Sequence, residues 1–375
     1  MSLKFFKSHF RLFLFAFLIA ALSVNAFAWG DEGHHITVRI AASFLTPAAR
    51  IEVIKLLKVD AGNNESYYKT HCPNVLALLK RSAFLTIPEG NTLLSDGLAC
   101  VASWADPPLK RERPYTSNWH FVDIPVVMAT SANPTLFTYD AARDCRTDSE
   151  RGDCAIQALE RFQPVLANFK NPAVKGHEFG EELTSRAEAL KYFIHIIGDI
   201  HQPMHCATDK KSKASVNDPK DVGDMGGNLV FVTWFGVATT PFGANELHAV
   251  WDEGFIGRTM DNKKFTEAQY AQFLVKNISP DNLKTLQTQP ANFRSWAGES
   301  YNLSVTNAYG KLPKIDAACK VMKKDNVPQT DRNGKPVMGC YRLSDDYFNA
   351  NNPIVEQQLQ TGGARLAGLL NTMFK

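Results

Sequence analysis

Apolar residues recur at helical spacing along most of the chain, and this pattern predicts a mainly α-helical protein. A first helix is expected over residues 33–45, where Ile36 and Ile40 fall on one stripe. Thr46 followed by Pro47 is typical of the cap and the first position of a second helix. The side chains expected to face the core from this second helix are Ile51, Ile54 and Leu57.

The other strong signals lie in the middle and at the end of the chain. Residues 187–202 predict a strongly apolar helix that Pro203 ends. Residues 354–374 predict a closing helix, or a pair of helices broken near Gly362 and Gly363. The best strand signal is residues 229–235, expected to form half of a short, minor β-hairpin. Polar residues predict loops over 207–222 and 321–337.

The first 28 residues have the pattern of an export signal. Three basic residues precede an apolar run of 13 residues, and Ala26-Phe27-Ala28 then supplies the small-x-small pattern of a cleavage site. A membrane-spanning helix needs about 20 apolar residues, so a retained anchor is the weaker interpretation. We therefore expect a signal peptide over residues 1–28, cut between Ala28 and Trp29, and a single exported domain over residues 29–375 without stable membrane association.

Composition indicates a globular protein and excludes several other classes. Hydrophobic residues make up 45% of the 375 residues and charged residues 21%, which does not fit a disordered tail, a coiled coil or a collagen-like chain. The formal net charge of +3 disappears with the leader, which carries three of the 41 basic residues and none of the 38 acidic ones. Bulk electrostatics then predicts no attraction for a polyanion, so any affinity for phosphate must come from a local site.

Seven cysteines follow the leader, and in an exported protein cysteines usually form disulfides. None lies in a Cys-x-x-Cys zinc pattern. The sequence does not determine the connectivity, and the odd count leaves at least one thiol unpaired, for which Cys206 is the candidate. The expected bridges are Cys145–Cys154, Cys319–Cys340 and, more loosely, Cys72–Cys100.

Two pairs of a histidine and an aspartate are spaced four residues apart. His195 and Asp199 project from one face of the central apolar helix, so both can hold a single ion. A His–Asp hydrogen bond in the core is the alternative, since a buried carboxylate or imidazole is costly unless it is paired or metal-bound. His248 and Asp252 repeat the spacing, and His205 lies beyond the central helix, free to join them. These three would form a site with an open position, as in catalytic zinc sites.

Further candidate ligands are scattered along the chain. Trp29 would be the first residue after cleavage, where its free amine and its carbonyl oxygen can chelate a metal, with His34 close in sequence. Asp106 ends the segment Ala-Ser-Trp-Ala-Asp, and His120 lies among apolar residues in Trp-His-Phe-Val-Asp-Ile-Pro. Each has an ordinary alternative, as a turn residue, a core imidazole or a surface histidine.

Together, in this order, these segments resemble the zinc-dependent single-strand nucleases of the S-one/P-one type, in the superfamily that includes zinc phospholipase C. The resemblance runs from Trp29 to Asp252 and includes Phe-Ile-His-Ile-Ile-Gly-Asp-Ile-His-Gln-Pro-Met-His, the turn Asp-Met-Gly-Gly-Asn at 224–228, and Asn-Glu-Leu-His-Ala-Val-Trp-Asp. It implies the mainly α, single-domain fold of that superfamily.

The resemblance also implies three zinc ions in one cleft. Asp199 would bridge two of them, which in two-metal sites lie about 3.5–4 Å apart. Asp106 and Asp199 are accordingly the expected catalytic residues, beside a water that the bridged pair makes acidic enough to attack phosphorus. The implied ligands are Asp106, His120, His195 and Asp199 for the first ion, Trp29, His34 and Asp199 for the second, and His205, His248 and Asp252 for the third.

The implied activity is hydrolysis of single-stranded DNA and RNA to 5′-phosphate products, together with 3′-nucleotidase activity, by a monomer. Phe121 offers a face for stacking a base and Asp123 an acceptor for its edge. Asn228 would lie near the base or the phosphate, and Lys110 is a looser match to a basic residue of the family. His201 is expected to have a structural role.

Two other functions remain compatible with the sequence. Zinc phospholipase C shares the N-terminal Trp and much of the ligand order, but its last site resembles His-x-x-x-Glu, where this chain has His248 and Asp252. The alternative of a different class is a secreted, metal-stabilised binding protein without turnover. The open third site argues against it, because structural zinc sites are normally closed.

Overall fold

The computed structural model describes the chain from Trp29 onwards, with several internal gaps. The described ranges are 29–81, 87–106, 109–126, 139–145, 152–167, 174–175, 182–183, 186–209, 223–237, 239–240, 243–244, 246–324, 327–328 and 338–375. The predicted leader, residues 1–28, lies outside these ranges, and so does most of the two predicted polar loops. Within these ranges, no helix combines the length and the apolar character needed to cross a membrane.

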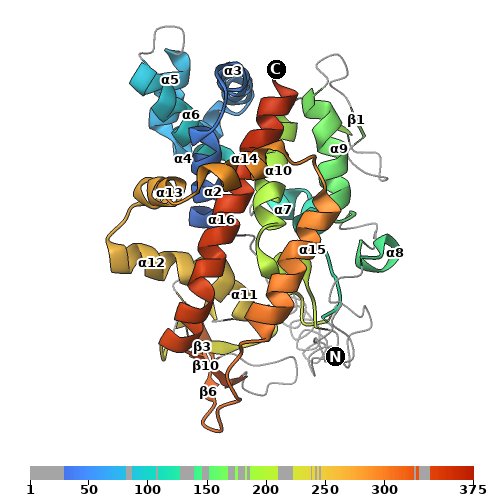
Figure 1. Ribbon diagram of the computed structural model, residues 1–375, viewed down its shortest axis with the longest axis vertical. Coiled ribbons are helices and arrows are strands. Elements are labelled where there is room, and N and C mark those ends of the chain that lie inside the picture. The colour runs from blue at the N-terminus through green and yellow to red at the C-terminus, as the bar shows by residue number, and fades with distance from the viewer. Residues whose placement is uncertain are drawn as a thin grey trace, which may run out of the picture.

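Helices dominate the architecture, which confirms the predicted mainly α class (Figure 1). The α-helices are α2 (Asp31–Ser43), α3 (Pro47–Asn63), α4 (Glu65–His71), α5 (Pro73–Lys80), α6 (Ile87–Ala102), α7 (Leu109–Glu112), α8 (Ala141–Asp144), α9 (Ala155–Ala167), α10 (Arg186–Asp199), α11 (Leu247–Ala249), α12 (Phe255–Lys263), α13 (Glu267–Lys276), α14 (Pro280–Thr288), α15 (Phe293–Leu303) and α16 (Asp345–Met373). The more tightly wound 3₁₀ helices are η2 (Pro114–His120) and η3 (Pro203–Cys206). The more widely wound π-helices are η4 (Val250–Gly254) and η5 (Ser304–Tyr309).

The strands are short and pair two by two. They are β1 (Val174–Lys175), β2 (Glu182–Leu183), β3 (Val232–Trp234), β4 (Thr239–Thr240), β5 (Gly243–Ala244), β6 (Lys320–Val321), β7 (Lys323–Lys324), β8 (Val327–Pro328), β9 (Met338–Gly339) and β10 (Tyr341–Leu343). The strand predicted at 229–235 is confirmed as β3, but its expected hairpin partner is wrong, because β3 pairs in parallel with β10 near the end of the chain. A parallel partner requires a long connection, so no local sequence signal marks it.

The first two helices follow the predicted pattern except at one position. Thr46 caps α3 by accepting a hydrogen bond from the Ala49 amide at 3.3 Å, with Pro47 at the first position. Val53 lies at the centre of the buried stripe of α3, with Leu57 one turn further along. Ile51 was predicted to face the core but is 57% exposed, because two helical positions from Val53 correspond to about half a turn.

Helix α10 is the central buried element, and every residue of it except Glu188 is buried. It ends at Asp199, three residues before the predicted end, and is followed by a turn in which the Gln202 amide donates to the Asp199 carbonyl at 2.9 Å. The chain then enters η3 at Pro203. Asp199 therefore lies at the very end of a rigid helix, where its side chain is oriented but the following chain can turn.

Helix α16 runs unbroken along the molecule beside α2 (Figure 1). The predicted break at Gly362 and Gly363 is wrong. A Cβ atom at Gly363 would lie 2.6 Å from two Ile40 side-chain atoms and 2.8 Å from the Thr37 carbonyl oxygen. The glycine therefore permits the close approach of α2 and α16 instead of ending the helix.

Two hydrophobic clusters make up the core, and α2 contributes to both. Val38 belongs to a cluster built around α3, α6, α9 and α10. Ile40 belongs to the other, with Trp29, Trp251 and Phe255. Because α2 packs into both clusters, the residues at its start have a fixed position relative to α10 and to η4.

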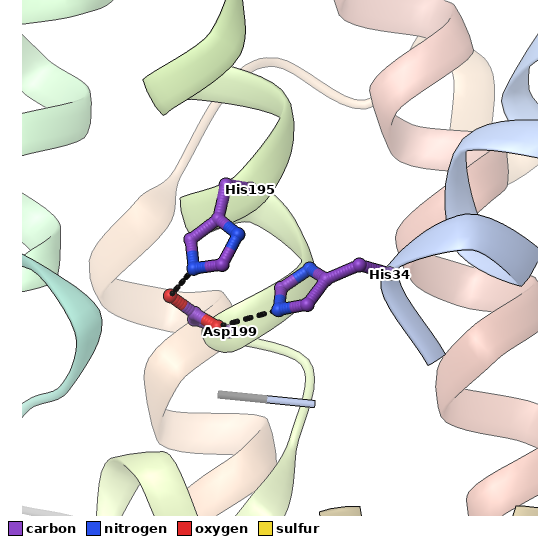
Figure 2. A group of neighbouring side chains, drawn as sticks. All are labelled: His34, His195 and Asp199. Atoms are coloured by element: carbon purple, nitrogen blue, oxygen red, sulfur yellow. Dashed lines mark ion pairs between the residues drawn. The ribbon is translucent and has the colours of Figure 1, made fainter. Parts of the chain in front are cut away.

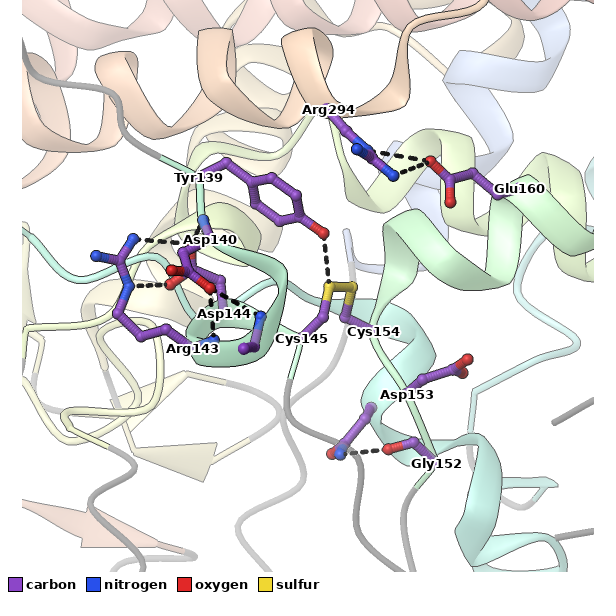
Figure 3. Close-up of a disulfide and its surroundings, with 12 residues drawn as sticks. Tyr139, Asp140, Arg143, Asp144, Cys145, Gly152, Asp153, Cys154, Glu160 and Arg294 are labelled. Carbon is purple, nitrogen blue, oxygen red and sulfur yellow. Dashed lines mark hydrogen bonds and ion pairs between the residues drawn. A yellow bond between two sulfur atoms is a disulfide. The ribbon is translucent and has the colours of Figure 1, made fainter. Parts of the chain in front are cut away.

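The structure confirms the three expected disulfides, Cys72–Cys100, Cys145–Cys154 and Cys319–Cys340, and leaves Cys206 as a buried free thiol. Figure 3 shows the Cys145–Cys154 bridge, with the Tyr139 hydroxyl 3.3 Å from the Cys145 sulfur. This bridge joins the end of α8 to the start of α9.

Candidate metal centre

Three groups of buried histidines and aspartates have the composition of metal sites. In each group the possible ligand atoms lie within 4.8 Å of one another. The groups are His34, His195 and Asp199; Asp106, His120 and His195; and His205, His248 and Asp252. All eight side chains were predicted as ligands, and they come from segments spread between residues 34 and 252.

Asp199 lies between two imidazoles that belong to different helices (Figure 2). Its Oδ1 atom is 3.3 Å from Nε2 of His34 on α2, and its Oδ2 atom is 3.3 Å from Nε2 of His195. The two rings stack, with centroids 3.9 Å apart and planes 17° apart. Each carboxylate oxygen therefore faces a different group, which is the arrangement that a bridging carboxylate requires.

The group of Asp106, His120 and His195 adjoins this carboxylate. Nδ1 of His120 lies 3.1 Å from Asp199 Oδ2 and 2.9 Å from Nε2 of His195. Asp106, at the end of the Ala-Ser-Trp-Ala-Asp segment, is 3.7 Å from His195 and 3.9 Å from His120. One donor atom from each of four side chains thus converges on one point, as tetrahedral zinc coordination requires. The four side chains are Asp106, His120, His195 and Asp199.

The third group combines a 3₁₀ helix with a π-helix. His205 in η3 and His248 in α11 bring their Nε2 atoms to 3.1 Å from each other. Asp252 in η4 lies 3.6 Å from His205 and 3.2 Å from His248. The segment that carries His248 and Asp252 is therefore a short α-helix that widens into a π-helix, a feature that is frequent at functional sites.

Main-chain carbonyl groups orient three of the histidines. Nδ1 of His195 donates to the Ala102 carbonyl at 2.7 Å, Nδ1 of His205 to the His120 carbonyl at 2.6 Å, and Nδ1 of His248 to the Gly226 carbonyl at 2.7 Å. A carbonyl accepts only, so the proton resides on Nδ1 and the Nε2 lone pair faces the group. Such outer contacts are the usual way in which proteins fix a metal-binding tautomer.

Several atoms in these groups are buried without a hydrogen-bond partner. They are both ring nitrogens of His34, Nε2 of His120, and one carboxylate oxygen each of Asp199 and Asp252. A buried polar atom without a partner is costly. Cations bound among these side chains would supply partners to most of these atoms, so the residues fit a metal centre.

Burial keeps the imidazoles of His34 and His195 neutral, because it lowers the pKa of each to about 4. It raises the pKa of Asp199 to about 6. Burial raises the pKa of Asp106 as well, but the nearby Lys110 and imidazoles outweigh it and lower that pKa overall. At neutral pH these four residues therefore present imidazole lone pairs and ionised carboxylates, which are the forms that bind metal.

Trp29 packs directly against the centre. Its side chain is fully buried, and its indole Nε1 donates to the Gly198 carbonyl at 2.8 Å, one residue before Asp199. The next residue, Gly30, donates from its amide to the Asp252 carbonyl at 3.3 Å. The beginning of the described chain is thus held between the residue that precedes Asp199 and the third group.

The segment after His120 carries two of the predicted substrate contacts. Phe121 and Asp123 are partly buried. The Phe121 carbonyl accepts from the Ala155 amide at 3.1 Å, and the Asp123 amide donates to the Asp144 carbonyl at 3.1 Å. Those partners are direct neighbours of Cys154 and Cys145, so the disulfide in Figure 3 braces this segment from both sides.

The other two predicted contacts lie at the edge of the groups. Lys110 places its ammonium 2.6 Å from Asp106 Oδ1 and is 12% exposed. Asn228 is buried, and its Nδ2 donates to the Met225 carbonyl at 2.7 Å, so its amide stabilises the turn at 224–228. A substrate contact by either residue stays a prediction.

Sequence reasoning missed the residues that support the centre. Asp224 is fully buried, accepts from the Tyr309 hydroxyl at 2.7 Å and from the Asp209 amide at 2.8 Å, and so anchors the turn whose Gly226 carbonyl orients His248. Gln202 contacts Asp252. Both lie inside segments already noted as motifs. Gln202 does not have a residue type that indicates a ligand, and the aspartate at 224 is engaged in the turn and not in any of the three groups.

His201 has the structural role that was expected. Its Nδ1 donates to the Ile197 carbonyl at 2.7 Å, and its Nε2 accepts from the Arg365 guanidinium at 3.1 Å. Both ring nitrogens are therefore engaged, which explains why this histidine joins none of the three groups although it lies between His195 and His205.

Proteins with related sequences are nucleases. A model of the S1/P1 nuclease family matches residues 29–375. Endonuclease 3 of Arabidopsis thaliana is 28% identical over 371 residues, which cover 97% of this chain and 95% of that protein. Nuclease S1 of Aspergillus oryzae is 25% identical over 356 residues, covering 94% and 93%, and nuclease P1 of Penicillium citrinum is 26% identical over 281 residues, covering 74% and 84%. The chain therefore belongs to the S1/P1 nuclease family, whose members are metal-dependent hydrolases of the phosphodiester bonds of nucleic acids.

Proposed function

We propose that this protein is an exported, trinuclear zinc nuclease that cleaves single-stranded DNA and RNA to 5′-phosphate products and also acts on 3′-nucleotides. The observation that carries the proposal is the convergence of three buried His/Asp groups, two of which share His195. The donor set consists only of imidazoles and carboxylates, which suit zinc.

The proposed side-chain ligands are those of the three groups, and the amine and carbonyl of Trp29 are added on the basis of the proposed cleavage after Ala28. Asp106, His120, His195 and Asp199 hold one ion; His34, Asp199 and the amine and carbonyl of Trp29 hold the second; His205, His248 and Asp252 hold the third. When bound, the ions supply Lewis acidity that activates water and stabilises the leaving 3′-oxygen. Three dications against three aspartates leave about +3 in the cleft, enough to attract phosphate to a chain without net charge.

The remaining residues bind and orient the substrate in this proposal. The ring of Phe121 stacks a nucleobase and the Asp123 carboxylate accepts from its edge, which requires a base freed from a duplex. Lys110, beside Asp106 at 2.6 Å, turns its ammonium to a substrate phosphate once a cation has replaced it at the carboxylate. Asn228 lies near the base or the phosphate.

Export is part of the proposal, because a free amine at Trp29 requires cleavage after Ala28. Three disulfides support an oxidising destination, periplasmic or extracellular. The fully buried position of Trp29 supports cleavage at this residue, since the indole contact with Gly198 brings the chain start next to Asp199. The mature chain is proposed to act as a monomer and as one domain over residues 29–375.

The Asp199→Asn variant tests this function. An amide cannot bridge two cations as a carboxylate does, so the variant is expected to lose at least one bound zinc and to fall in kcat by a factor of about 10² or more. Zinc quantification and assays on single-stranded DNA, single-stranded RNA and 3′-nucleotides measure both effects. Full activity with unchanged zinc content would reject the ligand assignment.

Phosphatidylcholine is the control substrate in the same assays. Turnover of lipid alone would favour the phospholipase alternative, and turnover of none of these substrates by zinc-loaded protein would favour a binding protein. Double-stranded DNA, assayed in parallel, tests the expected preference for single strands.

A further inference from the structure

Gln202 occupies the turn that joins two of the candidate ion groups. It is fully buried and lies between Asp199, the last residue of α10, and His205 in η3. Its amide donates to the Asp199 carbonyl at 2.9 Å, and its carbonyl accepts from the His205 amide at 3.1 Å. The backbone of this one residue therefore links the bridging aspartate to the first ligand of the third group.

The side chain of Gln202 can adopt only one orientation in this network. The Met204 amide donates to the side-chain oxygen Oε1 at 2.5 Å. Because a main-chain amide is only a donor, the oxygen must face Met204 and the NH₂ group must face the other way. There Nε2 donates to Oδ1 of Asp252 at 2.5 Å.

Because of this contact, the two oxygens of the Asp252 carboxylate have different surroundings. Oδ1 accepts from Gln202 and lies 3.6 Å from Nε2 of His205. Oδ2 is buried without a hydrogen-bond partner and lies 3.2 Å from Nε2 of His248. The hydrogen bond from Gln202 therefore engages Oδ1 and leaves Oδ2 as the oxygen that the third group can use in full. A carboxylate that binds through one oxygen leaves more of the coordination sphere for substrate than one that binds through two.

We propose that Gln202 is a positioning residue for the third ion, fixing Asp252 as a one-oxygen ligand by donating from Nε2 to Oδ1. The inference rests on the proposed trinuclear site and adds to it a residue that contacts no ion. Outer contacts of this kind change metal affinity by about 10- to 100-fold when they are removed.

Two substitutions separate this role from a purely structural one. Gln202→Glu keeps an oxygen to accept from the Met204 amide but places a second oxygen against Asp252 Oδ1. Gln202→Met keeps the approximate volume and removes both hydrogen bonds. The matched control is Gln287→Leu, which removes a partly buried glutamine amide from α14, a helix that carries no candidate ligand.

Zinc stoichiometry and affinity are measured by competition with a chromophoric chelator, on protein with a verified Trp29 terminus. Wild type and Gln287→Leu are expected to bind three ions. Gln202→Glu and Gln202→Met are expected to keep two ions at wild-type affinity and to bind the third at least about tenfold more weakly. With zinc in excess, kcat on a 3′-nucleotide should recover towards the wild-type value, which a damaged fold would not do.

The outcomes distinguish this proposal from the proposed function. Fewer than three ions in wild type would overturn the trinuclear site and the role of Gln202 with it. Three ions of equal affinity in wild type and both Gln202 variants would overturn only the role of Gln202. Failure of both variants to fold would also overturn it, because Gln202 would then support the fold instead of the ion.

Discussion

The contact between α2 and α16 permits a prediction in which two similar substitutions have opposite signs. Gly363→Ala adds a methyl group where two Ile40 atoms lie at 2.6 Å and the Thr37 carbonyl oxygen at 2.8 Å. Gly257→Ala adds the same group on α12, where no heavy atom lies within 4 Å. Within a helix, alanine is more favourable than glycine by about 1 kcal/mol at either position.

The two variants are therefore expected to differ in free energy of unfolding only because of packing. Overpacking costs about 1–3 kcal/mol, and a backbone oxygen cannot swing aside as a side chain can. Since the crowded atoms at Gly363 include a backbone oxygen, the overpacking cost is expected at the upper end of that range, about 2–3 kcal/mol. Gly363→Ala is therefore expected to lose about 1–2 kcal/mol after the helix propensity is counted, whereas Gly257→Ala is expected to gain up to about 1 kcal/mol. His34 lies one turn before Thr37 on α2, so Gly363→Ala should also weaken zinc binding.

Denaturant unfolding of the zinc-loaded proteins measures the midpoints, which are comparable where the slope is unchanged. Chelator competition measures zinc affinity on the same samples. A Gly363→Ala protein as stable as wild type would refute the reasoning, because it would show that α2 and α16 separate without cost. Equal destabilisation of both variants would refute it as well, since only one site is crowded.

Three further predictions concern the metals, the chain start and a disulfide. A strong chelator is expected to abolish nuclease activity and to lower the unfolding midpoint. Added zinc, but not magnesium, should restore both. An unchanged midpoint would contradict a structural contribution of the ions. One extra residue before Trp29 should remove one zinc and most activity, and equal zinc content in both forms would exclude the amine as a ligand. Replacing Cys145 and Cys154 by serine should raise KM for oligonucleotides at unchanged zinc content, whereas loss of the Cys319–Cys340 bridge should leave KM unchanged.

The sequence predicted which side chains meet in the three His/Asp groups better than it predicted the surroundings of these groups, and the reason is physical. Histidine and aspartate are costly to bury, so their placement among apolar residues, as at His195 and Asp199, is already a signal. The carbonyl of Gly226 orients His248 equally strictly, but a main-chain group has no residue type that could mark it. The role of Gln202 could not be predicted from its residue type either. It follows only from the two hydrogen bonds that its side chain makes, one with Met204 and one with Asp252.

The errors in fold prediction have a common origin in distant partners. Gly362 and Gly363 are typical of a helix end, but Ile40 needs the space that Gly363 leaves, and packing outweighed local propensity. Residues 229–235 were assigned a neighbouring strand because hairpins are the local solution, whereas the partner of β3 is β10. Periodicity within a segment contains no information about which remote segment will cover it.

The pairing of β3 with β10, and of α2 with α16, has a consequence for the order of folding. The helix that bears His34 and the strand that precedes His248 each acquire one of their neighbours, α16 and β10, only from the last part of the chain to be synthesised. Contacts between such remote segments form late, because loop closure must come first. An N-terminal fragment would lack these supports. The protein is therefore expected to bind its ions only after translation is complete. Late ion binding would keep a hydrolase of nucleic acids inactive while it is being made inside the cell.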